Sequence, residues 1–460
     1  MTDRGVSLPV QAGARYLKED LSAAEYVRRV RARAAAPLLD LDAGYAFALM
    51  ASTLFIAPLG TFGALLFSLT AVAYIAMRPA MVRRILGNRW GFLLFPACAI
   101  LTALWSDAPF ETAKHGCEFL LTVMAALMLS AAPNKRAVVL GLFAAFAVFA
   151  VVSLSVGEVV QIGTSNVTAV AGLTDSKNEE AATMVTGFLV SFLFLAMGIR
   201  SRSVLQSSCA VFVGAVQIFG AVMAKSAGAL AAAGVAFAAF LIFIWLRKSS
   251  RHTRFAIIGF GFIAVLIAGV IFLAFHNDVL EWLSGTFNKD MTLTGRTYLW
   301  ERARELALER PIEGRGFAAF WQQGNLDAEG LWQFAHIQSR FGFNFHSTYY
   351  DIVIGMGWIG LAVFAVTLAF GVGRAATAYV RKPTLIACFW LAIAIDLLIR
   401  MPIETIGTYE FDFATLLLFA LFGSRSERLD ARLAPRGRRA RGLGVAPEDP
   451  FQPRPYWPAE

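Results

Sequence analysis

The chain consists mainly of long apolar runs separated by short polar connections. About twelve of these runs are long enough, or nearly so, to cross roughly 30 Å of hydrocarbon as a helix. They cover residues 43–60, 62–77, 91–105, 117–132, 137–156, 181–199, 204–222, 227–246, 255–275, 348–371, 384–400 and 411–423. The pattern predicts an all-α, polytopic integral membrane protein with about twelve transmembrane helices.

Composition supports this class. Hydrophobic residues make up 57% of the chain and charged residues only 16%, and the mean hydropathy is +0.60. These values lie outside the range of ordinary soluble domains. The formal net charge of +9 would suggest nucleic acid in a soluble protein, but here the excess lies in short loops and at the termini. We therefore expect no nucleic-acid partner.

The basic residues occupy every second loop, which predicts that these loops face the cytoplasm. An even number of spans places both termini on that side, and both terminal segments are rich in arginine. We divide the chain into a cytoplasmic N-terminal segment (1–42), nine spans (43–275), one large extracytoplasmic loop (276–347), three spans (348–423) and a disordered cytoplasmic tail (424–460).

The large loop between spans nine and ten is the one long polar insert of the chain. Thr294 is predicted to cap a helix that runs to about Arg310 and stops at Pro311. Gly314 and Gly316 then permit a tight turn, whose bare backbone N–H groups are predicted to face an anion.

Aromatic residues follow this turn. Phe317, Phe320 and Trp321 are suited to form a platform on which a sugar ring stacks. The alternative is a belt of aromatic rings at the membrane interface, which is common in membrane proteins.

Taken together, these motifs and their order resemble the O-antigen ligase and polysaccharide polymerase family, with most likeness to its exopolysaccharide-polymerase branch. The matching positions are Thr294, Gly295, Arg296, Trp300, Pro311, Gly314, Arg315, Gly316, Phe317, Phe320, Trp321 and His346, followed by Gly355, Gly357 and Gly360. Lys177 and Asn178 resemble the basic-plus-asparagine signature of the same family.

One position departs from that pattern. The family usually has a serine followed by a basic residue after the seventh span, whereas here Lys225 precedes Ser226. Either Lys225 reaches the same point from the neighbouring turn, or the phosphate site depends on other cations.

The resemblance implies transfer of a glycan from a polyprenyl-diphosphate carrier to a sugar hydroxyl, at the periplasmic face of a bacterial inner membrane. It implies a metal-independent glycosyltransferase without a cofactor. The implied partners are the lipid-linked donor, a glycan or lipid A-core acceptor and membrane lipids, and polysaccharide export machinery is a further candidate. The large loop is then the periplasmic catalytic loop.

Such a site needs cations for the diphosphate and one base for the acceptor proton. The diphosphate-binding candidates are Arg296, Arg315, Lys225, Lys177 and Arg340. The substrate-binding candidates are Asn178, Trp300, Phe320 and Trp321.

His346 is the candidate general base, because a neutral imidazole accepts a hydroxyl proton near neutral pH. A lone histidine here would more often anchor the next span, and the family match favours the catalytic role. His336, in the same insert, is the reserve candidate.

Several carboxylates have structural interpretations. Asp40 and Asp42 are predicted to start the first helix and not to hold a metal, and Asp396 is predicted to pair with Arg400. Arg400 and Glu404 are further expected to border the site, because the loop 401–410 opens on the same face as the insert.

Two alternatives remain open. A flippase for lipid-linked sugar would also be polytopic, but transporters usually keep their polar residues near the midplane of two related halves. Within the enzyme hypothesis, ligase and polymerase share the same chemistry, and the stretch from Thr294 to Trp321 favours a polymerase.

Overall fold

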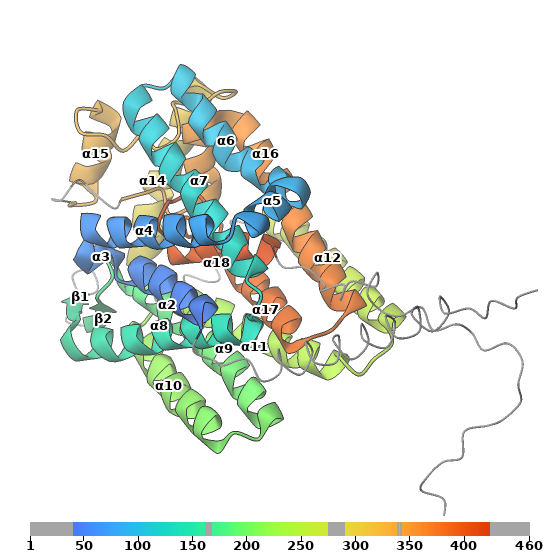
Figure 1. Ribbon diagram of the computed structural model, residues 1–460. Helices are drawn as coiled ribbons and strands as arrows, with labels where there is room; N and C mark the ends of the chain where they lie inside the picture. The colour runs from blue at the N-terminus through green and yellow to red at the C-terminus, as the bar shows by residue number, and fades with distance from the viewer. Residues whose placement is uncertain (1–39, 162–167, 275–289, 338–339, 341–342, 424–460) are drawn as a thin grey trace, which may run out of the picture. The chain divides into compact units, whose positions relative to one another are not determined.

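In the computed structural model of the protein (Figure 1), the described residues are 40–161, 168–274, 290–337, 340 and 343–423. They lie within one unit of mutually packed elements, Ala36–Ser426. Three of the predicted segments fall wholly or partly outside the described residues: the N-terminal segment up to residue 39, parts of the large loop and the tail 424–460.

The described chain is almost entirely helical. Its first part forms α2 (Leu41–Leu54), α3 (Ile56–Leu59), α4 (Thr61–Met77), α5 (Pro79–Asn88), η1 (Trp90–Leu93), α6 (Leu94–Leu101), η2 (Thr102–Leu104), α7 (Pro109–Ala131), α8 (Lys135–Val156), α9 (Lys177–Ser201) and α10 (Val204–Met223). Its second part forms α11 (Ala227–Leu246), α12 (Arg251–Ala274), α14 (Asp290–Glu309), α15 (Leu326–Phe334), α16 (Thr348–Arg381), α17 (Leu385–Arg400) and α18 (Phe413–Gly423). Every predicted apolar run contains at least one helix, so the helical class is confirmed.

Five of the described helices, namely α8, α9, α10, α11 and α16, are long and apolar enough to cross a membrane. The pair α4 and α5, bent by 93°, adds a sixth if it is counted as one span. Large apolar side chains also cover exposed helix surfaces, which suits contact with lipid. Examples are Leu65, Leu69, Leu205, Phe212, Phe260 and Ile263. The protein is thus a multi-pass membrane protein, while the count of about twelve spans is not confirmed.

A small β-hairpin lies between α8 and α9, where the pattern of apolar runs predicts only a polar connection. Strand β1 (Glu158–Gln161) pairs antiparallel with β2 (Thr168–Gly172). The hydroxyl of Ser153 on α8 donates to Glu180 on α9 at 2.7 Å, and it accepts from the N–H of Leu173 at 3.0 Å. These bonds hold the base of the hairpin against the start of α9.

Two predictions about carboxylates are confirmed. Asp40 caps α2 by accepting from the N–H groups of Asp42 and Ala43, each at 3.0 Å. Asp396 pairs with Arg400 at 2.5 Å inside α17, where both side chains are buried. A buried charge needs such a partner, because desolvation would otherwise be costly.

The Gly314–Gly316 turn fills a break in α16. Gly357 has a φ of 63° and a ψ of −169°, which interrupts the helix and leaves backbone groups without helical partners. The turn supplies them, because the N–H groups of Arg315 and Gly316 donate to Ile354 and Gly355 at 2.8 Å each.

This packing leaves no room for side chains on the glycines. A Cβ on Gly357 would lie 2.1 Å from the carbonyl oxygen of Ile312, and one on Gly314 would lie 2.5 Å from the N of Gly357. The predicted role of the turn in anion binding is therefore wrong. Its N–H groups at Gly314, Arg315, Gly316 and Phe317 all have protein acceptors.

Candidate active site

Helix α14 carries the first candidate residue. It begins at Asp290, so the predicted cap at Thr294 is wrong and Arg296 lies in the second turn. Leu299, Ala303 and Leu306 share a buried face that packs on a small core. The other buried members of that core are Phe320, Ala328, Leu331, Trp332, Phe345 and Ile354. This packing fixes α14 and the side chain of Arg296 that projects from it.

Arg296 and His346 meet at the carboxylate of Glu404. The Nη2 of Arg296 lies 3.1 Å from Glu404 Oε1, and the Nδ1 of His346 lies 3.7 Å from Glu404 Oε2. Arg296 also donates through Nη1 to the carbonyl of Ile403 at 2.7 Å. A cation, a carboxylate and an imidazole from three separate segments thus form one cluster, which we call the Glu404 cluster.

The cluster keeps Glu404 ionised. Burial alone would raise the pKa of Glu404, but its contacts with the imidazole of His346 and the guanidinium of Arg296 outweigh burial and lower it. The distance to His346 is too long for a hydrogen bond but short enough for electrostatic interaction. The carboxylate of Glu404 is thus the electrostatic partner of the imidazole.

The backbone of His346 is held in an uncommon conformation. Its φ is 47°, in the left-handed region that costs free energy for a residue with a side chain. Its N–H donates to the side chain of Asn344 at 2.7 Å. The hydroxyl of Thr405 contacts both Asn344 and Asp351. This network joins the insert, α16 and the loop of Glu404, and it aims the imidazole.

The predicted aromatic residues pack against Phe345, the residue before His346. The indole Nε1 of Trp300 donates to the carbonyl of Phe345 at 2.8 Å, next to His346. Phe320 is 4% exposed, and Trp321 is half-buried with its ring against Phe343 and Phe345. The exposed platform predicted for these rings is not formed by Phe317 and Phe320, because both are buried.

The start of α9 lies beside the Glu404 cluster. Glu179, in the first turn after Lys177 and Asn178, is close enough to interact electrostatically with Glu404 and Asp412. Lys177 and Asn178 are half-buried. The role of Lys177 and Asn178 at the site stays a prediction.

The turn between α10 and α11 approaches the same loop. A Cβ on Gly228 would lie 3.2 Å from the side chain of Ile403, and Ala224 and Ala229 pack on Ala181 of α9. Lys225 is exposed in this turn, with a φ of 52°. Ser226 precedes α11 without a capping hydrogen bond from its side chain. The uncapped N-terminus of α11 and Lys225 therefore add positive potential near Ile403.

The other two cationic candidates are engaged elsewhere. Arg315 forms ion pairs with Asp107 at 3.3 Å and Asp327 at 3.7 Å, and also with Glu309. Arg340 is about half exposed and pairs with Glu329 at 3.0 Å. The structure thus brings Arg296 and His346 together and gives Arg315 and Arg340 carboxylate partners of their own.

The residues that complete the cluster could be found in the sequence only in part. Glu404 stands on the predicted outer loop, which suggested that it borders the site. Asn344, Asp351 and Thr405 carried no recognisable motif. Their pairing joins positions 54 and 61 residues apart. The reserve histidine, His336, is exposed just after α15.

The fold and the Glu404 cluster together define a multi-pass helical membrane protein with a histidine–carboxylate–arginine site at its polar insert. Residues 210–365, which include Arg296 and His346, match the O-antigen ligase family. The chain is also 28% identical, over 400 residues, to the exopolysaccharide production protein ExoQ of Rhizobium meliloti (strain 1021). That similarity covers 81% of this chain and 86% of the relative. The two matches support an O-antigen ligase and ExoQ-like family, and the resemblance recognised in the sequence is confirmed.

Proposed function

We propose that this protein joins glycans in exopolysaccharide or O-antigen biosynthesis, by transfer from a polyprenyl-diphosphate-linked donor to a sugar hydroxyl. The convergence of Arg296 and His346 on Glu404 supports this proposal most strongly, since it combines a phosphate-binding cation with an oriented base. The family match and the similarity to ExoQ support the glycan chemistry. The large loop and its site are proposed to face the periplasm, with both termini in the cytoplasm of a bacterium.

The donor diphosphate binds between Arg296 and the α10–α11 turn in this proposal. Arginine has five N–H donors, and the contacts to Ile403 and Glu404 use two of its nitrogens. Lys225 and the uncapped start of α11 supply further positive potential. Lys177 is the fourth contributor, from the start of α9.

His346 acts as the general base. The acceptor hydroxyl oxygen attacks the anomeric carbon of the donor, and its proton passes to His346. The bond from that carbon to the diphosphate oxygen breaks, and the polyprenyl diphosphate leaves with the electron pair. Glu404 stabilises the imidazolium that forms. Because the diphosphate is already a good leaving group, no acid is needed to protonate it, and we propose a transfer that uses neither metal nor cofactor.

The experiment that tests this function is an analysis of lipid-linked intermediates and exported glycan in a deletion strain. Accumulated single repeat units without long chains would support a polymerase. Intact polymer that fails to reach a lipid A core would support a ligase. Loss of repeat units from the outer leaflet alone would contradict transfer and identify a flippase.

A further inference from the structure

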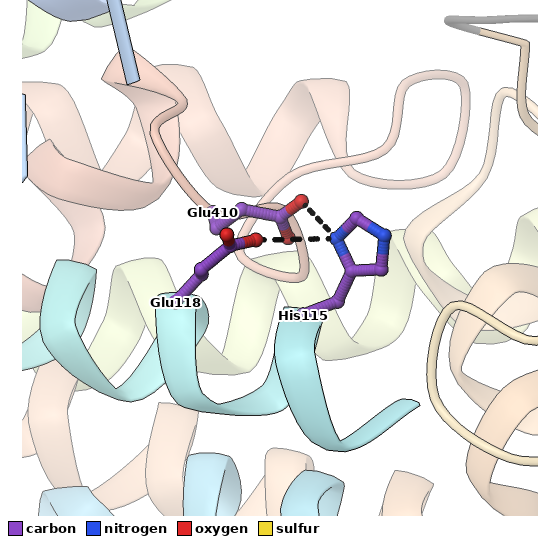
Figure 2. Close-up of side chains that lie close together, drawn as sticks. All are labelled: His115, Glu118 and Glu410. Carbon is purple, nitrogen blue, oxygen red and sulfur yellow. Dashed lines mark hydrogen bonds and ion pairs between the residues drawn. The ribbon is translucent and has the colours of Figure 1, made fainter. Parts of the chain in front are cut away.

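A second cluster of ionisable groups lies between α7 and the loop that precedes α18 (Figure 2). His115 and Glu118 project from α7, and Glu410 approaches them from the loop. The Nδ1 of His115 lies 2.7 Å from Glu410 Oε1 and 3.4 Å from Glu118 Oε2. One potential ligand atom from each of the three residues lies within 4.8 Å of the other two.

The backbone positions these three side chains before any ligand binds. His115 and Glu118 are three residues apart on α7, so they share one helix face. The loop is fixed by the N–H of Phe411, which donates to Thr122 on α7 at 3.1 Å. Phe411 also has a left-handed φ of 53°, which turns the chain directly after Glu410. Glu410 is thereby held over the face that carries His115.

The donor set suits a transition metal ion. One imidazole nitrogen and two carboxylate oxygens are typical ligands of zinc, whereas magnesium prefers oxygen alone. All three side chains are partly shielded from solvent, with exposures of 24% for His115, 32% for Glu118 and 16% for Glu410. Partial burial limits the competition from bulk water for these ligands.

A fourth residue supplies an independent indication. The second ring nitrogen of His115, Nε2, lies 3.4 Å from the carboxylate of Glu111. Histidines that bind metals commonly donate their other N–H to a carboxylate, which fixes the tautomer and the ring orientation. Glu111 lies beside Nε2 of His115 and the two other carboxylates lie beside Nδ1, so the ring is placed for such an arrangement.

We propose that His115, Glu118 and Glu410 bind one divalent transition metal ion of the zinc class. The ion would be coordinated by Nδ1 of His115 and by one oxygen of each glutamate, with water completing its shell. It would join α7 to the loop that also carries Glu404. This proposal does not depend on the proposed transfer, because the ion would lie at the opposite end of the 404–410 segment from Glu404. The ligands come from positions 295 residues apart, so no motif in the sequence predicts this site.

The test is a titration of the purified full-length protein in detergent, without a histidine tag and after removal of metal with a chelator. Zinc chloride is added and the heat of binding is measured, with magnesium chloride as the comparison ion. We expect one zinc ion per chain and weak or no binding of magnesium. His115→Ala and Glu410→Gln should each weaken zinc binding by about tenfold or more, and Glu111→Gln by about tenfold. His336→Ala is the matched control, because it removes an exposed histidine outside the cluster.

A second readout covers variants that fold poorly. Zinc should raise the midpoint of thermal unfolding of the wild-type protein and of His336→Ala, but not that of Glu410→Gln or Glu118→Gln. If the wild-type protein binds no zinc, the cluster is only a set of histidine–carboxylate contacts and the proposal is wrong. Unchanged zinc affinity in both Glu410→Gln and His115→Ala would equally overturn it.

Discussion

Arg296 and Arg315 lie in the same polar insert, but their surroundings differ. Their side chains are similarly buried, with exposures of 16% and 14%. Among the described residues, Arg315 faces three carboxylates from three segments. Arg296 has one carboxylate partner there, Glu404, which also lies near His346. Equal burial therefore does not distinguish the two arginines, whereas the charge around each guanidinium does. We propose that Arg296 is the one that binds phosphate, because an arginine that already faces three carboxylates attracts a further anion less strongly.

The two regions also divide the family motif into two tasks. The Gly314–Gly316 turn, with Arg315 between its glycines, donates hydrogen bonds to the carbonyl groups that the break of α16 leaves without helical partners. It thereby attaches the insert to the helices. Arg296 and His346 contribute chemical groups to the cluster that this turn holds in place. Variants of the two regions should therefore fail in different ways.

The largest effect is expected from removal of the base. His346→Ala should lower the rate of glycan transfer by roughly a hundredfold or more, the scale of losing general-base catalysis. Donor binding and the thermal unfolding midpoint should stay near those of the wild type. The rate is measured with purified protein in lipid vesicles and a polyprenyl-diphosphate-linked glycan. His336→Ala is the control, and full activity in His346→Ala would remove His346 from the mechanism.

A comparable effect, but on stability, is expected at the break of α16. Gly357→Ala places a Cβ against the carbonyl of Ile312 and forces a residue with a side chain into a conformation that favours glycine. We expect a loss of about 3 kcal/mol or more in the free energy of unfolding. Thermal unfolding in detergent measures it. Gly373→Ala, in the same helix but with open space around it, should change little, and equal stability of the two variants would contradict the proposed role of the break.

A smaller effect is expected at Glu404, which contacts both His346 and Arg296. Glu404→Gln removes the charge that stabilises the imidazolium, so the transfer rate should fall by roughly tenfold. Donor affinity should not weaken, because the loss of a negative charge does not reduce attraction for a diphosphate. Rate and affinity are measured separately by single-turnover kinetics. Asp107→Asn, at the Arg315 ion pairs, is the control, and a rate that falls equally in both variants would contradict the division of tasks.

The smallest effect concerns pH. Since the pKa of Glu404 is lowered in the folded protein, its ionised form stabilises the fold above the ordinary glutamate pKa of about 4.3. That stability is lost as the pH falls through the lower pKa of the folded state. The unfolding midpoint of the wild type should therefore exceed that of Glu404→Gln at neutral pH, and the difference should shrink in acid. A difference that grows in acid would contradict the direction of this shift.

The sequence predicted the helical membrane fold because a long apolar run favours a helix whose surface is buried in lipid or in the protein. It also predicted the local pairs, such as Asp396 with Arg400, whose members are four residues apart. It did not predict the pairing of β1 and β2, because strands of four and five residues carry little periodic signal. It did not predict the bonding of the Gly314–Gly316 turn either, because those bonds go to Ile354 and Gly355, which are distant in sequence. Arg315 was listed with Arg296 as a diphosphate-binding candidate, because the sequence does not show that three carboxylates surround Arg315.

The Glu404 cluster was predicted in its members but not in its arrangement. Arg296 and His346 belong to a recognisable motif, whereas Glu404 was expected only to border the site. The network of Asn344, Asp351 and Thr405 behind His346 lacks any motif and became visible only in the folded chain.

The central claim is that the carrier diphosphate binds at Arg296 and not at Arg315. The most direct measurement is the affinity of the purified protein for a polyprenyl diphosphate, compared between Arg296→Ala and Arg315→Ala. We predict that Arg296→Ala weakens binding by about tenfold or more, the scale of a lost charge-assisted contact. Arg315→Ala should keep the wild-type affinity and lower only the unfolding midpoint. Unchanged affinity in Arg296→Ala, together with a loss of affinity in Arg315→Ala, would contradict this account.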